Sequence, residues 1–134
     1  MRKFLFKLLS ASIAIICLLS VTDASLYASR QISECSTQLV ASGNTVTVYY
    51  KIIGTGIMDE IGASKIVIQR YINSSWEPVK TFTKYNTVGM VDYNTISHTS
   101  SVSYTSTQSG TYRAVVEVFA TLDGETDSRT LIAT

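Results

Sequence analysis

Apolar side chains recur at every second residue along several stretches of this chain, and this alternation restricts its fold more than any other feature. With the other apolar segments between turns, it gives seven expected strands: residues 35–41, 46–52, 65–72, 76–82, 98–104, 112–120 and 128–133. A period of two is typical of strands that bury one face, whereas a helix repeats every 3.6 residues. No helical period follows residue 24, so the sequence predicts an all-β fold.

Residues that favour tight turns separate these segments. Gly43, Asn73, Gly110 and the pair Asp123-Gly124 each lie between two alternating runs. Asp-Gly tolerates the positive φ angles of a type I′ hairpin turn, so the last two segments should pair as a hairpin. We also predict loops over residues 54–62 and 84–95, and an edge position for the strand with Pro78. Seven short strands with frequent turns favour an antiparallel β-sandwich, with a small barrel as the alternative.

The segment from Ser109 to Ala114 resembles a motif of immunoglobulin domains. In that motif, Gly-x-Tyr-x-Cys, the tyrosine hydroxyl fixes the chain at the entry to a late strand. Tyr112 matches the tyrosine, and Ala114 stands where the cysteine would be. The resemblance implies an immunoglobulin-like sandwich without the inter-sheet disulfide.

The N-terminus has the layout of a secretory signal peptide. A basic start is followed by 15 uncharged residues, Leu8 to Thr22, and then by small residues before a cut after Ala24, with a cut after Ala28 as the alternative. Such a signal is helical and is removed after export. We therefore predict a signal peptide over residues 1–24 and a secreted β-sandwich domain over residues 25–134, with membrane contact only through the signal before cleavage.

Charge and cysteine content narrow the possible partners. Cleavage after Ala24 would leave eight basic and nine acidic residues, a net charge of −1, with no run of basic residues. Nucleic-acid binding needs a clustered basic face, so none is expected. Cys35 would be the one cysteine left, which predicts no internal disulfide. Its thiol would be either buried or part of an intermolecular bridge.

Most of the mature chain resembles a family of small secreted domains of unknown function from Gram-positive bacteria. The resemblance extends from Cys35 to Thr130, and its distinctive part is the segment Gly54-Thr55-Gly56-Ile57-Met58-Asp59-Glu60-Ile61-Gly62-Ala63-Ser64. It implies secretion and a β-sandwich, and it implies no activity.

The same glycine-rich segment allows two interpretations. Gly54, Gly56 and Gly62 would let a ligand approach the backbone, and Asp59 and Glu60 would supply oxygen ligands. The alternative, which we favour, is a structural crossover between sheets with Met58 and Ile61 filling the end of the core. No phosphate-binding fingerprint is present, because the glycine spacing is wrong and no helix follows.

Other polar residues offer only weak candidates for chemistry. Asp123, Glu125 and Asp127 form an acidic i, i+2, i+4 array that is a weak calcium candidate. His98, the single histidine, would have to serve as the base of any serine or cysteine hydrolase. It falls on the alternating face of its strand, so we favour a hydrogen-bonded histidine at the edge of the core. We assign no catalytic residue, no metal and no cofactor.

Aromatic residues give the remaining candidates for binding. A solvent-facing platform would draw on Tyr49, Tyr71, Trp76, Tyr85 and Tyr93, with Tyr49 as its best member. The expected function is a non-catalytic module that binds an extracellular protein, a glycan or an envelope component. The alternatives are a self-assembling envelope or matrix protein, through an edge strand or Cys35, and a small hydrolase that uses His98.

Overall fold

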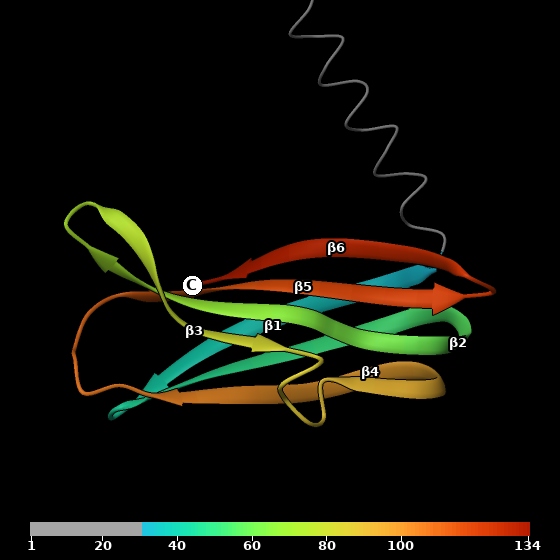
Figure 1. The fold of residues 1–134 in the computed structure, drawn as a ribbon, viewed down its shortest axis with the longest axis horizontal. Coiled ribbons are helices and arrows are strands. Elements are labelled where there is room, and N and C mark those ends of the chain that lie inside the picture. Colours follow the sequence, from blue (N-terminus) through green and yellow to red (C-terminus); the bar gives the residue numbers. More distant parts are fainter. Residues whose placement is uncertain (1–30) are drawn as a thin grey trace, which may run out of the picture.

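The computed structural model describes residues 31–134, which form one antiparallel sheet of six strands and no helix (Figure 1). The strands are β1 (Ile32–Ser42), β2 (Thr45–Ile72), β3 (Ser75–Thr83), β4 (Val91–Thr105), β5 (Tyr112–Leu122) and β6 (Glu125–Ala133). The predicted signal peptide and the predicted cleavage site lie outside the described residues. Within residues 31–134, no helix is long and apolar enough to cross a membrane.

Strand β2 organises the sheet because it pairs with four other strands. Its first half, residues 45–53, lies between β1 and β4, and residues 65–72 lie between β3 and β5. β6 pairs with the far side of β5. The sheet curls along β2, so that β1 also contacts β5 and β6 (Figure 1). The fold is therefore an all-β, antiparallel, curled sheet.

The expected strand count of seven is wrong, because two of the expected strands are one. The loop predicted over residues 54–62 remains extended inside β2, so residues 46–52 and 65–72 belong to the same strand. Residues 58–62 hydrogen-bond to β4 on one side, and residues 60–63 to β5 on the other. These long-range pairs outweigh the preference of glycine for loops. The second predicted loop, 84–95, is also too long, because β4 already begins at Val91.

The alternating side chains form the core, as the sequence predicts. Val48 and Ile52 from the first half of β2, Ile68 from the second half and Val116 from β5 are all fully buried in one cluster. Met58 and Ile61 are also fully buried, which confirms that they fill the core. The curl of β2 thus brings the apolar faces of its two halves into one interior.

The predicted turns occur where their residues can adopt positive φ. Asn73 and Ser74 have φ of 50° and 67° between β2 and β3, and Asp123 and Gly124 have 52° and 79° between β5 and β6. Two successive positive values match the type I′ geometry that joins twisted strands. Pro78 lies on β3, which pairs only with β2 among the described strands, so its edge position is also confirmed.

Candidate functional site

Tyr49 lies on the outer face of the first half of β2, between the buried residues Val48 and Tyr50. Its side chain is 49% exposed and stands in a shallow hollow of about 400 Å³. The lining of this hollow includes Ser36, Thr37, Gln38, Lys51 and Thr99. The hollow therefore combines one aromatic ring with hydroxyl, amide and ammonium groups.

The register of β1, β2 and β4 fixes this surface. Tyr49 pairs with Gln38 on β1 and with Ser101 on β4. Along β4, every second residue from 97 to 105 carries a hydroxyl: Ser97, Thr99, Ser101, Ser103 and Thr105. Thr47 and Ser103 share a hydrogen bond of 3.1 Å between their side-chain oxygens. We call this outer surface of β1, residues 45–53 of β2 and residues 97–105 of β4 the hydroxyl face.

Trp76 lies elsewhere, on β3, and forms a cluster with Tyr71, another platform candidate, and with Arg113, which the sequence did not single out. Its ring is 5.1 Å from that of Tyr71, its cross-strand partner. The guanidinium of Arg113 lies 4.4 Å from the Trp76 ring, and Arg113 Nε donates to Gln69 Oε1 at 2.6 Å. The Trp76 indole therefore packs against neighbouring side chains of the sheet, as expected for cross-strand pairs. No described contact joins Trp76 to Tyr49.

Glu60, Tyr85 and Tyr93 come together near Lys84. The Lys84 ammonium is 3.2 Å from Glu60 Oε1 and 5.3 Å from the centre of the Tyr85 ring. Tyr93 pairs with Glu60 across β4 and β2, and its side chain is 67% exposed. Glu60 is therefore already neutralised by Lys84 rather than free to coordinate a ligand.

The glycines of the predicted ligand segment have a packing role. None of Gly54, Gly56 and Gly62 has a positive φ, which corrects the expectation of loop conformations there. A Cβ atom at Gly62 would lie 2.2 Å from the Met90 carbonyl oxygen, and one at Gly54 would lie 2.8 Å from the Gly56 carbonyl oxygen. Two of the three glycines are thus required by close backbone contact. Space at Gly56 is open.

The acidic residues of the calcium candidate point in different directions. Asp123 and Glu125 are exposed, whereas Asp127 is buried. Asp127 Oδ2 accepts hydrogen bonds from the backbone N–H groups of Gln31 and Ile32, both at 3.2 Å. Asp59 accepts from the backbone N–H of Asp123 at 2.9 Å. Within residues 31–134, no three His, Cys, Asp or Glu side chains are grouped as a metal site.

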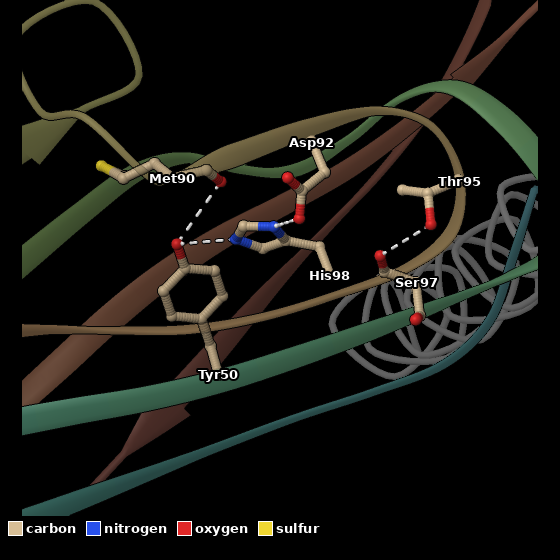
Figure 2. Close-up of polar contacts among 6 residues, drawn as sticks. All are labelled: Tyr50, Met90, Asp92, Thr95, Ser97 and His98. Carbon is tan, nitrogen blue, oxygen red and sulfur yellow. Dashed lines mark hydrogen bonds and ion pairs between the residues drawn. The ribbon is translucent and has the colours of Figure 1, made fainter.

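A buried polar cluster surrounds His98, which is 3% exposed (Figure 2). Its Nδ1 lies 2.7 Å from Asp92 Oδ2, and its Nε2 lies 3.2 Å from the Tyr50 hydroxyl. The Tyr50 hydroxyl also donates to the Met90 carbonyl oxygen at 3.4 Å. The interpretation of His98 as a hydrogen-bonded histidine at the core edge is confirmed. Its partners Asp92 and Tyr50 were not recognised, because alternation shows which face a residue occupies and not what it meets there.

The environment of Tyr50 keeps its hydroxyl protonated. The pKa of Tyr50 is raised to about 12. Burial is the main cause and the negative charge of Asp92 adds to it, whereas a side-chain hydrogen bond with Ser100 acts in the opposite direction. A phenol with such a pKa is a poor nucleophile near neutral pH. The Asp92–His98–Tyr50 chain has the order of a catalytic triad, but the residue in the position of the nucleophile is a buried phenol whose pKa is raised.

Two structural residues also have defined surroundings. The Tyr112 hydroxyl donates to the backbone oxygen of Gln108 at 2.6 Å and lies 2.7 Å from Ser106 Oγ. Ala114 is fully buried in the core. Cys35 is a free, half-buried thiol whose Sγ lies 3.9 Å from Arg129 Nη1.

Comparison with known proteins finds no matching family model and no matching curated protein. Among solved structures, a family 76 glycoside hydrolase from a bovine Bacteroides thetaiotaomicron strain is similar over 77% of this chain, with a TM-score of 0.37 and 13% identity. The chain covers 20% of the length of that structure. A likeness at this level carries no argument about fold family or activity.

Proposed function

We propose that this chain is a secreted, non-catalytic module that binds a glycan on its hydroxyl face, with Tyr49 at the centre of the site. One observation carries the proposal: a half-exposed tyrosine stands in a hollow of about 400 Å³ whose lining is rich in hydrogen-bonding groups. Binding surfaces are enriched in exposed tyrosine because the ring offers apolar area with little loss of conformational entropy.

The chemistry of the lining suits a sugar. Sugars present hydroxyl groups that both donate and accept hydrogen bonds, and serine, threonine and glutamine side chains do the same. The Tyr49 ring would pack against an apolar sugar face. Lys51 adds one positive charge, which would favour a glycan with an acidic substituent.

The pairing order supports an immunoglobulin-like sandwich as the scaffold. The first half of β2 would form one layer with β1 and β4, and its second half would form the other with β3, β5 and β6. The Tyr112 hydrogen bond to Gln108, four residues upstream, has the form of the tyrosine corner. Secretion follows from the signal pattern of residues 1–24.

The arrangement around His98 supports a binding role over hydrolysis. A general base needs a ring nitrogen within hydrogen-bonding reach of a nucleophile that a substrate can approach. Here Asp92 occupies one nitrogen, and the other faces a buried phenol whose pKa is raised to about 12. A broad hydrolase screen of wild type and His98→Ala tests the alternative, and a rate that depends on His98 would establish hydrolysis instead.

The experiment for glycan binding is a co-sedimentation assay with insoluble peptidoglycan and chitin, plus affinity electrophoresis in a soluble β-glucan. Tyr49→Ala should weaken retention at least about tenfold, which corresponds to about 1.4 kcal/mol. Tyr85→Ala is the matched control, because Tyr85 is 88% exposed and does not line the hollow. Failure to bind any of the three, or equal retention of both variants, would refute the proposal.

Export is tested separately by N-terminal sequencing of the protein recovered outside the cytoplasm. A start at Ser25 is expected from the predicted cut after Ala24. A chain that keeps Met1 and residues 2–24 would contradict secretion by signal cleavage without affecting the glycan assay.

A further inference from the structure

Four strands of the described sheet, β1, β3, β4 and β6, each pair with one neighbour and so have a free edge. Free edges invite pairing with another chain unless charge, proline or a bulge prevents it. β3 is protected by Pro78 and a register shift opposite Ile68 and Gln69. β1 has a register shift between Ile32 and Glu34.

The beginning of β1 is also covered by side chains from β6. Asp127 accepts hydrogen bonds from the backbone of Gln31 and Ile32, and Arg129 Nη2 donates to the Ile32 carbonyl oxygen at 3.0 Å. β6 itself carries the charged residues Glu125, Asp127 and Arg129. β3 and β6 therefore carry protection against pairing. β1 is protected only at its beginning, because residues 35–42 contain no charged residue, proline or glycine and keep an unbroken register with β2.

β4 presents the longest unprotected stretch, residues 97–105. This stretch, Ser97-His98-Thr99-Ser100-Ser101-Val102-Ser103-Tyr104-Thr105, contains no Asp, Glu, Lys, Arg, Pro or Gly. Its register with β2 is unbroken from Ser97 opposite Ile53 to Thr105 opposite Thr45. The side chain of His98, the one imidazole in the stretch, points inward to Tyr50 and Asp92 (Figure 2). The stretch is a straight edge without charge.

We propose that this edge pairs antiparallel with the β4 edge of a second copy of the chain, with the two-fold axis at Ser101. In this register Thr99 lies opposite the partner's Ser103, and Ser97 lies opposite the partner's Thr105. Hydroxyl residues facing one another are favourable cross-strand pairs. On the inner face, Tyr104 lies opposite the partner's His98.

We assign a second copy of the chain as the partner of this edge because the edge is complementary to itself. A two-fold interface uses the same patch on both subunits, so every residue must tolerate its symmetric mate. Residues 97–105 place no two like charges opposite each other and leave no bulky exposed residue at the axis. Half of their backbone hydrogen-bonding groups face away from β2, and a second β4 satisfies them.

The dimer would join two hydroxyl faces into one surface. Tyr49 pairs with Ser101, which is the residue on the axis. The two Tyr49 residues would thus be separated by three strand spacings, or about 14 Å. One glycan chain crossing both sites would gain avidity. The dimer itself does not depend on glycan binding.

The test is sedimentation equilibrium of protein expressed from the full sequence, in reductant, from micromolar to millimolar concentration. Wild type should form dimers. Ser101→Lys and Ser101→Glu should each weaken dimerisation at least about tenfold, because two like charges meet at the axis. An equimolar mixture of the two variants should restore dimers. Thr130→Lys, an exposed substitution on β6, is the matched control and should dimerise as wild type does.

A wild type that stays monomeric at millimolar concentration would overturn the proposal. So would dimers that persist in both Ser101 variants, or a mixture that fails to recover dimers while each variant has the far-UV spectrum of the wild type. If dimers form only when the reductant is left out, a disulfide through Cys35 joins the two copies and the β4 edge does not. All of these readouts are independent of retention on polysaccharide, so this inference and the glycan proposal can fail separately.

Discussion

The rings of Tyr50 and His98 lie 5.4 Å apart between centroids, tilted by 37°, with Nε2 of His98 3.2 Å from the Tyr50 hydroxyl. Tyr50 is on β2 and His98 on β4, and both are almost completely buried. Asp92, whose side chain is 59% exposed, connects this pair to the solvent. A row of hydrogen-bonded polar side chains thus extends from the surface into an apolar interior. There, the loss of any hydrogen-bond partner should destabilise the fold.

Tyr50→Phe should destabilise the fold by about 1–3 kcal/mol. The substitution removes the hydroxyl that meets His98 Nε2 and leaves a buried ring nitrogen without this partner, which costs its desolvation energy. Urea unfolding at pH 7 measures the loss. Tyr49→Phe, at the exposed neighbouring position, is the matched control and should change stability by less than about 0.5 kcal/mol. Equal stability of the two variants would contradict a structural role for the pair.

Stability should fall in alkaline solution because of Tyr50. Its pKa is raised from 10.0 to about 12 in the folded state. Below pH 10 both states keep the proton and the full contribution is present. Between pH 10 and 12 the unfolded state loses its proton first, so the free energy of unfolding declines by up to about 3 kcal/mol. Urea titrations from pH 9 to 12 should show a smaller decline for Tyr50→Phe, and identical slopes would exclude this origin.

Local chemistry made much of the fold predictable from the sequence. Alternation assigns Val48, Ile52 and Val116 to the core, because a strand places successive side chains on opposite faces. The Asp123-Gly124 turn follows from the few residues that tolerate positive φ. The exposed position of Tyr49 follows from its neighbours in the same way.

Relationships between distant segments were not predictable in this way. The glycines of residues 54–62 indicated a loop by composition, but Gly62 is needed where β2 passes the Met90 backbone, 28 residues along the chain. Asp127 belonged to an acidic pattern that suggested a metal site at a hairpin, yet its side chain is buried and accepts a hydrogen bond from the backbone N–H of Ile32. The single-sequence pattern holds no information on which strands meet, so these partners required the structure.

Tyr112→Phe should cost about 1–2 kcal/mol. The lost hydroxyl donates to the Gln108 carbonyl oxygen and contacts Ser106 Oγ, and both contacts fix the connection between β4 and β5. Thermal unfolding of the variant measures the effect. Tyr93→Phe is the control, since the Tyr93 side chain is 67% exposed. If Tyr112→Phe is as stable as Tyr93→Phe, the Tyr112 hydroxyl does not contribute to stability and the prediction is wrong.

The glycine-rich part of β2 makes the sharpest prediction about packing, because its three glycines differ in the space around them. At Gly62 a Cβ would lie 2.2 Å from the Met90 carbonyl oxygen and 2.7 Å from Val91 Cα, and backbone atoms cannot rotate away as a side chain does.

Gly62→Ala should therefore force β2 and β4 apart and destabilise the protein by about 3 kcal/mol or more, within the range of severe packing defects. Gly56→Ala makes the same chemical change in the same strand with no atom within 4 Å, and it should alter stability by less than about 0.5 kcal/mol. Chemical denaturation of both variants, with soluble yield as a second readout if Gly62→Ala does not fold, distinguishes them. If instead the glycines serve ligand approach, both variants should be stable, and Gly56→Ala should impair polysaccharide binding.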